Sequence, residues 1–146
     1  MSRRILHPTD FSKASSAAFT RAVADARASR SELVLVHVLA PVIPVAGEGY
    51  VSPSVYEQMA ESARRWAQKQ MGRLLARAKA ARVRARGLVL EGVAHEQIVR
   101  AAKQQRAGVI VMGTHGRTGV ARFFLGSVAA RVAAAAPCPV LTVRGR

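Results

Sequence analysis

Cysteine, aromatic rings and acidic side chains are all scarce in this chain of 146 residues. The single cysteine, Cys138, excludes an internal disulfide, and its apolar neighbours predict a small packed side chain rather than a reactive thiol. Aromatic residues make up 5% of the chain, so few rings are present to stack on nucleic-acid bases. Half of the residues are nevertheless hydrophobic, which is enough to bury a sizeable core.

The sequence also lacks a long hydrophobic run. Its longest nearly apolar stretch, 33–47, contains His37, Pro41 and Pro44 and falls short of the roughly 18 residues that a membrane span needs. Two arginines near the amino terminus have no apolar segment behind them, so no secretory signal is predicted. We therefore expect a cytoplasmic protein with no membrane partner, built as a single domain over residues 1–146.

The shortage of acidic residues leaves a strongly basic chain. There are 23 Lys and Arg against 8 Asp and Glu, a net charge of +15. One explanation of this charge is a nucleic-acid or other anionic partner. The alternative is that the cations lie on solvated helix faces and bind no partner. Because the cations are spread along the chain rather than gathered in one tract, we do not expect nucleic acid as the main partner, and we favour a phosphate ligand.

Hydrophobic periodicity predicts alternating strands and helices. Two continuous apolar runs, 33–39 and 108–113, are typical of parallel strands covered on both faces. Further strands are predicted from Arg4 into the turn residues 8–10, over 83–91 and over 139–144. Helices are predicted from about 12 to 30, from 55 to 81, between Gly92 and Gly108, and over 127–135.

Apolar residues at spacings of three and four indicate which helix faces point inward. In the first helix they are Ala18, Phe19, Ala22, Val23 and Ala26, and in the third they are Ile98, Val99 and Ala102. In the long second helix the recurring positions, apolar except for Gln70, are Val55, Met59, Ala63, Trp66, Gln70, Leu74 and Ala78, with Trp66 expected in the core rather than as a ligand platform. The stretch 40–54 mixes three prolines and two glycines and is expected to be an irregular excursion or a lid.

This order of elements predicts an α/β fold with an open five-stranded parallel sheet and helices on both faces. Ligands of such sheets bind beyond the carboxyl ends of the strands, where the strand order reverses. The loops after the first, second and fourth strands should therefore meet. They comprise residues 8–10, 38–41 and 113–127.

The last of these loops, GTHGRTGVARFFLGS, is rich in glycine and ends where a helix is predicted to begin. The first amides of a helix have no intrahelical acceptors and lie at the positive end of its dipole, so Gly126 and Ser127 suit phosphate oxygens. The alternative is a mobile surface loop with an ordinary helix cap. Neither the P-loop motif nor the dinucleotide-binding glycine motif is present, so a different nucleotide fold is required.

These residues resemble the nucleotide-binding subgroup of the universal stress protein family. The resemblance rests on Gly113-x-x-Gly116, nine further residues and Gly126-Ser127, together with ILHPTDFS at 5–12, VIVMGTHGR at 109–117 and PCPVLTV at 137–143. It covers the whole chain in order. Two positions depart from the family pattern, because Gly108 stands where Asp is usual and Ala94 where Pro is frequent.

The resemblance implies a Rossmann-like fold of the adenine nucleotide alpha hydrolase type, with an ATP site at the carboxyl edge of the sheet. Pro8, Thr9 and Asp10 match the turn that contacts the nucleoside, and the backbone of Val38 matches the position that meets adenine. Met112, Gly113, His115 and Gly116 match the ribose and phosphate side, and the triphosphate cradle is matched by Gly126, Ser127 and Val128. Arg117 and Arg122 are further candidates on charge alone, with solvated loop arginines as the alternative.

Few residues suit catalysis. Asp10 is the only acidic candidate in the expected cleft and is more suited to a turn or ribose contact than to metal binding, while His7, His37 and His95 are expected to be packing or surface residues. Mg²⁺ or Mn²⁺ bridging the phosphates would be held mostly through water. We therefore expect slow ATP hydrolysis at best, in a nucleotide-responsive stress or regulatory protein.

A second hypothesis is a stress-linked interaction module without nucleotide, acting through a dimer surface. The closing strand, 140–143, is apolar and expected at a sheet edge, where proteins cover or pair the exposed backbone groups. The resemblance implies a homodimer through this strand. Neither hypothesis identifies the stress or the protein partner.

Overall fold

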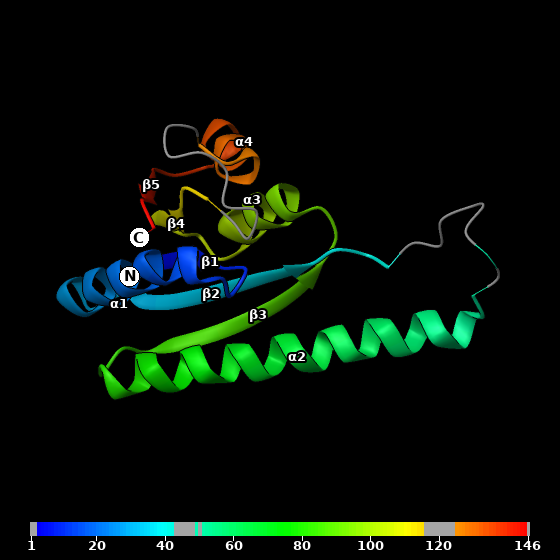
Figure 1. Cartoon of the computed structure of the whole chain (residues 1–146). Helices are drawn as coiled ribbons and strands as arrows, with labels where there is room; N and C mark the ends of the chain where they lie inside the picture. Colours follow the sequence, from blue (N-terminus) through cyan, green and yellow to red (C-terminus); the bar gives the residue numbers. More distant parts are fainter. Residues whose placement is uncertain (1–2, 43–48, 50, 116–124, 146) are drawn as a thin grey trace.

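The computed structural model describes residues 3–42, 49, 51–115 and 125–145, arranged as alternating strands and helices (Figure 1). The strands are β1 (Arg4–Pro8), β2 (Glu32–Leu39), β3 (Ala85–Glu91), β4 (Val109–Gly113) and β5 (Val140–Val143). A short 3-10 helix, η1 (Lys13–Ser15), precedes four α-helices: α1 (Ser16–Ser29), α2 (Pro53–Ala80), α3 (Ala94–Gln104) and α4 (Ser127–Ala135).

All four strand pairings are parallel, and the strand order is β3-β2-β1-β4-β5. β2 and then β3 follow β1 on one side of the sheet, and β4 and then β5 lie on the other side of β1. The strand order therefore reverses between β1 and β4, which places a ligand-binding crevice at their carboxyl ends. This confirms the predicted open, Rossmann-like parallel sheet.

Helices cover both faces of the sheet, α1 and α2 on one side and α3 and α4 on the other (Figure 1). Because strand side chains alternate between faces, Leu33 and Leu35 pack with α1 and α2, whereas Val34 and Val36 pack with α3 and α4. The continuous apolar run in β2 thus supplies both cores. The predicted inward residues of the first and third helices are buried or partly buried, which confirms those two faces.

The predicted inward face of the second helix is wrong in its first half. Val55, Met59 and Trp66 are 41%, 51% and 40% exposed, whereas the buried residues of α2 are Ala67, Met71 and Ala78. Figure 1 shows that the amino-terminal part of α2, which contains Val55 and Met59, extends past the end of the sheet and has no described strand beside it, whereas Trp66 lies in an aromatic cluster with Phe11 and His37. Apolar spacing alone does not reveal where the opposing layer ends.

The structure describes only part of the irregular stretch predicted at 40–54. Residues 43–48 and 50 lie outside the described residues, and α2 begins at Pro53. The edge position predicted for the closing strand is confirmed, since β5 pairs with β4 alone. None of the described helices has the length together with the hydropathy of a membrane-spanning segment.

Three helices end in an arginine with left-handed backbone geometry. Arg30, Arg82 and Arg106 follow α1, α2 and α3 with φ values of 54°, 61° and 53°. The residue after each arginine donates its amide to a carbonyl in the last turn, as in Ser31 N to Ala26 O at 2.9 Å, so these are Schellman caps. Glycine usually occupies this position because a β-carbon disfavours positive φ. The three caps place cations at the amino edge of the sheet.

We predict that Arg82→Gly raises the free energy of unfolding by about 0.5 kcal/mol, since relief of a left-handed side chain slightly exceeds the entropy that glycine adds to the unfolded chain. The matched control is Ala24→Gly at an exposed interior position of α1, which should lower stability by about 1 kcal/mol. Urea unfolding of the three proteins measures both effects. If both variants lost the same free energy of unfolding, the left-handed backbone of Arg82 would not be strained.

Candidate functional site

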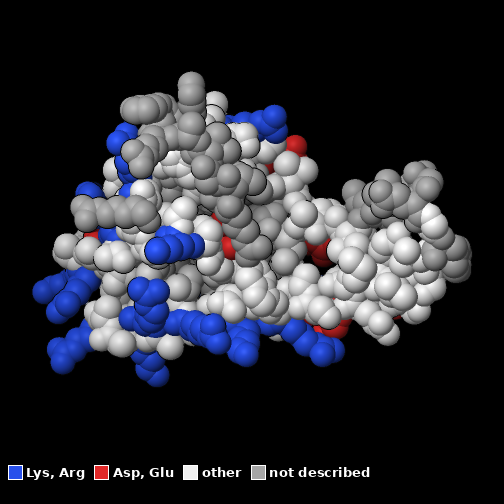
Figure 2. Space-filling view, in the orientation of Figure 1, with Lys and Arg blue, Asp and Glu red and all other residues white. Residues whose placement is uncertain are grey.

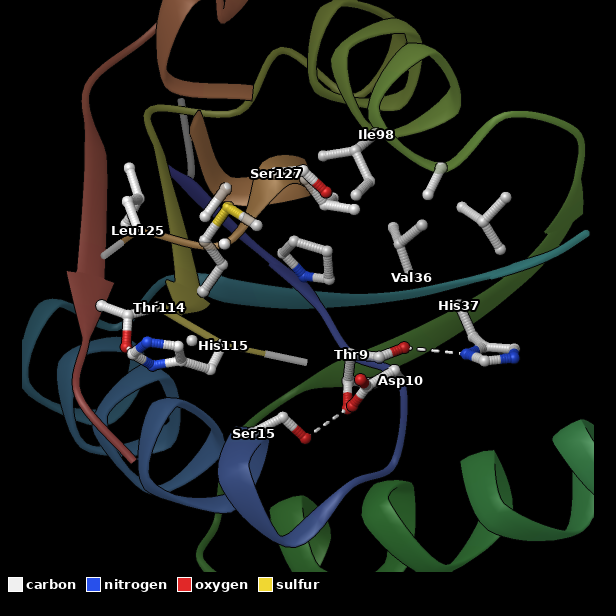
Figure 3. A pocket seen from close by; sticks show the side chains of 18 residues that line it. Thr9, Asp10, Ser15, Val36, His37, Ile98, Thr114, His115, Leu125 and Ser127 are labelled. Atoms are coloured by element: carbon white, nitrogen blue, oxygen red, sulfur yellow. Dashed lines mark hydrogen bonds between the residues drawn. The ribbon is translucent and has the colours of Figure 1, made fainter. Parts of the chain in front are cut away.

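A pocket of about 580 Å³ lies at the carboxyl ends of β1, β2 and β4, where the strand order reverses (Figure 3). Its walls are the amino-terminal ends of α3 and α4. The predicted loops do meet here, because the lining residues come from all three: Pro8, Thr9, Asp10, Ser15, Val36, His37, Val38, Ala94, Ile98, Met112, Gly113, Thr114, His115, Leu125, Gly126, Ser127, Val128 and Ala129.

The turn after β1 is fixed by hydrogen bonds between its own side chains and backbone. The Ser15 hydroxyl donates to the Ser12 carbonyl at 2.8 Å, so its oxygen accepts from the Thr9 hydroxyl at 3.1 Å. Thr9 Oγ1 in turn accepts from the Phe11 amide at 3.0 Å. The hydroxyl of Thr9 is therefore committed to the turn, and its place beside the pocket follows from the backbone.

Asp10 has the turn role that its position predicts. Its Oδ1 accepts the amide of Ser12 at 2.9 Å, an Asx turn that leads into η1. It is the only acidic residue among the described residues that line the pocket. No group of three His, Cys, Asp or Glu in the described part of the chain is placed to hold a metal ion.

An aromatic cluster joins this turn to α2. The rings of Phe11 and His37 lie 4.4 Å apart, and Trp66 meets Phe11 edge-on at 5.5 Å. The Nδ1–H of His37 donates to the Thr9 carbonyl at 2.8 Å, as the dashed line in Figure 3 marks. Phe11 has a φ of 62°, which is rare for an aromatic residue and is held here by the contacts on both sides. His37 is thus a packing residue, as expected, that also positions the pocket wall.

At the other end of the pocket, Gly126 lies against the strand that precedes the loop. Its amide donates to the Thr114 carbonyl at 2.7 Å, and a β-carbon added to Gly126 would lie 2.9 Å from that same oxygen. Glycine is required for space, since φ at this position is −58°. The contact brings the first turn of α4, with its unpaired amides, over the carboxyl end of β4.

The structure brings ten of the eleven predicted site residues into one pocket. Gly116 lies outside the described residues, as do Arg117 and Arg122. Sequence reasoning did not assign to the site Ser15, Val36, His37, Ala94, Ile98, Thr114, Leu125 and Ala129. For Ala94 and Ile98 the sequence did contain a signal. A helix that follows the third parallel strand begins at the carboxyl edge of the sheet, so the residues of its first turns lie near the pocket.

Comparison with known proteins agrees with this geometry. The family model for the universal stress protein family matches residues 1–144. The chain belongs to the universal stress protein family. A universal stress protein of Thermus aquaticus is 36% identical over 144 residues, which cover 99% of this chain and all of that protein.

Solved structures of universal stress proteins have the same fold. UspA from Lactobacillus plantarum superposes with a TM-score of 0.83 at 26% identity, covering 97% of each chain. A universal stress protein in complex with cAMP superposes with a TM-score of 0.70 at 25% identity, covering 99% of this chain and 98% of that one.

Beneath the pocket of this universal stress protein, His7 is completely buried in β1. Its Nδ1–H donates to the Val111 carbonyl of β4 at 2.7 Å, and its Nε2 has no hydrogen-bond partner among the described residues. Burial lowers the pKa of His7 from 6.5 to about 4, against the smaller opposing effects of the Val111 carbonyl and Asp10. Burial likewise raises the pKa of the Cys138 thiol, which accords with a packed, unreactive side chain.

We predict that stability falls as the pH falls below 6.5, because the unfolded chain binds a proton at His7 that the folded chain excludes until about pH 4. The free energy of unfolding should drop by about 2 kcal/mol from this group between pH 7.5 and 5. His7→Leu should remove that part of the pH dependence, and His95→Gln should retain it. Urea unfolding across this range provides the measurement, and equal slopes in His7→Leu and the wild-type protein would refute the assignment.

Proposed function

We propose that this protein binds ATP in the pocket between β1 and β4 and acts as a nucleotide-responsive stress or regulatory protein. The observation that carries the proposal is the convergence of the Thr9–Asp10 turn and the first turn of α4 on one cavity of about 580 Å³. This size suits a small-molecule ligand of the nucleotide class. The universal stress protein solved in complex with cAMP supports an adenine nucleotide.

The two ends of the pocket suit the two ends of a nucleotide. Val38 and Ile98 provide an apolar surface for the base, and Asp10 lies where a ribose hydroxyl can be bound. Ser127 begins α4, and its hydroxyl and the unpaired amides of that first turn suit phosphate oxygens. Met112, Gly113 and His115 line the same cavity.

ATP hydrolysis in this site would be slow. In-line phosphoryl transfer needs metal charge and a positioned water, and Asp10 is the only carboxylate among the described lining residues. Since Asp10 already accepts the Ser12 amide, it suits a structural role better than that of a base. Mg²⁺ or Mn²⁺ would be held by phosphate oxygens and water, with little direct coordination by the protein.

We predict that isothermal titration with MgATP gives saturable binding, and that adenine nucleotide is released when the purified protein is denatured. Ser127→Ala should weaken binding about tenfold, the effect of one hydrogen bond to a charged group. Gly126→Val should abolish binding at millimolar ATP, because the new side chain collides with the Thr114 carbonyl and displaces the first turn of α4.

The matched control for these variants is Gly72→Ala on α2. Its new β-carbon meets nothing within 4 Å, so it should leave the affinity unchanged. Absence of both bound nucleotide and titration heat in the wild-type protein at millimolar ATP would remove the proposal. Wild-type affinity in Gly126→Val would instead remove α4 from the phosphate site.

We further propose a homodimer through β5, which also provides the surface for the alternative function of a nucleotide-free interaction module. The carbonyls of Pro139 and Val143 accept from Ile110 and Thr114, so these backbone groups face β4. Because backbone groups alternate in direction along a strand, those of Val140 and Thr142 point to the open edge. An edge strand with free backbone groups invites pairing with a second copy.

We predict that light scattering at tens of micromolar protein gives twice the 15.6 kDa monomer mass, a concentration set by common weak affinities. Thr142→Pro should yield monomer while the pairing with β4 stays intact, since it removes an amide on the open side only. Thr142→Val keeps that amide and should remain dimeric. A monomeric wild-type protein, or a dimeric Thr142→Pro variant, would rule out this interface.

A further inference from the structure

The cations are spread along the sequence, but nine of them lie in residues 64–86, on α2 and the chain that leads into β3, and the nucleotide pocket does not use this charge. Between Glu61 and Glu91 there is no acidic residue, while the same stretch contains nine cations: Arg64, Arg65, Lys69, Arg73, Arg77, Lys79, Arg82, Arg84 and Arg86. Figure 2 shows these basic side chains gathered along the lower edge of the molecule, where α2 runs in Figure 1.

Eight of these nine residues are exposed. Arg64 pairs with Glu61, and Arg77 lies over the ring of Phe19. The other six form what we call the basic face: Arg65, Lys69, Arg73, Lys79, Arg82 and Arg84. Lys69, Arg73, Lys79 and Arg82 make no salt bridge with any described residue. Arg65, 76% exposed, shares Glu61 with Arg64. The basic face is therefore largely uncompensated.

The carboxylate of Glu32, on the strand beside β3, is already paired with two arginines. Glu32 accepts from Arg86 at 2.6 Å and lies 3.7 Å from Arg4. The Arg86 hydrogen bond holds the pKa of Glu32 below its ordinary value, with smaller contributions from the charges of Arg4 and Arg84. Of the basic face, Glu32 therefore offsets Arg84 alone, and only in part. The field of the exposed cations is left to act on a partner.

The helix fixes the spacing of these charges. Arg65, Lys69 and Arg73 follow each other at intervals of four residues, so they rise about 6 Å per step along one side of a rigid helix. From Arg65 to Lys79 the row extends about 21 Å. Arginine dominates the face and forms bidentate hydrogen bonds with phosphate.

We propose that the basic face binds the phosphate backbone of a nucleic-acid duplex, without sequence preference. A membrane surface is a poorer fit, because an interfacial helix inserts its apolar side and the apolar side of the carboxyl-terminal half of α2, at Ala67, Met71 and Ala78, is packed in the core. A single strand is also a poorer fit, since binding it stacks successive bases on exposed aromatic rings, and the one ring beside the described basic face, Trp66, packs on Phe11 and His37.

The basic face and the open edge of the sheet lie apart. β3, which α2 covers, and β5 are the two outer strands of the sheet. A dimer through β5 would therefore leave both basic faces exposed, and two linked faces bind a long polyanion more tightly than one. The proposal itself requires neither the dimer nor the nucleotide.

The test is fluorescence anisotropy of two labelled DNA duplexes of unrelated sequence, titrated with the full-length protein between 25 and about 200 mM salt, a range over which phosphate contacts are weakened. We expect the same affinity for both duplexes and a linear fall of log K with log salt. The triple variant Arg65→Gln/Lys69→Gln/Arg73→Gln should bind at least about tenfold more weakly, with a salt slope shallower by about 2.7 if each residue contacts one phosphate.

The matched control is Arg100→Gln/Lys103→Gln/Arg131→Gln, which removes the same charges from exposed positions on α3 and α4. It should retain duplex affinity within about threefold, well under the effect expected of lost phosphate contacts. Gly126→Val should also retain it, which separates this surface from the nucleotide pocket. Equal losses in the two triple variants would attribute binding to net charge alone and overturn the proposal. So would an absence of duplex binding at low salt, or binding of anionic phosphatidylglycerol vesicles in preference to duplex.

Discussion

The reversal of strand order at β1 is the constraint on which the rest of this structure depends. A right-handed crossover between parallel strands places its helix on a definite face of the sheet. The chain first builds β2 and β3 on one side of β1, with α1 and α2 on one face, and then crosses over to build β4 and β5 on the other side. Between the diverging connections, no helix or strand of the described residues covers the carboxyl ends of β1 and β4, and the pocket lies there.

This constraint also explains why the pocket wall is held by unusual local geometry. The chain must leave β1 and turn directly into η1 and α1 without closing the crevice. Three features make this turn possible: the hydrogen bonds of the Thr9 hydroxyl to Ser15 and to the Phe11 amide, the Asx turn of Asp10, and the positive φ of Phe11. His37 braces the same turn from β2. The turn is thus shaped before any ligand arrives, which reduces the ordering cost of binding.

Most of the fold follows from the sequence because its strongest signals are local. The apolar runs of β2 and β4 are typical of a sheet covered on both faces, and Gly126 before α4 and Ser127 at its start mark a helix that begins at the carboxyl edge of that sheet. The family resemblance then assigned the pocket residues. What the sequence did not predict depends on tertiary distances. Trp66 has core-like spacing but is 40% exposed, in an aromatic cluster with Phe11 and His37 rather than in the core. Ser15 and His37 enter the site through hydrogen bonds that no sequence pattern encodes.

The distribution of charge separates the two phosphate sites proposed for this protein. In the described part of the pocket the proposed phosphate donors are backbone amides and a serine hydroxyl, whose strength would come from their fixed direction in a confined site. On the outer face of α2 the donors are long, solvated side chains, whose individual contacts are weak and salt-sensitive. The first arrangement selects a ligand by shape and the second attracts any extended polyanion. A net charge of +15 is therefore compatible with a pocket whose described lining is largely neutral, because most of the described cations lie outside it.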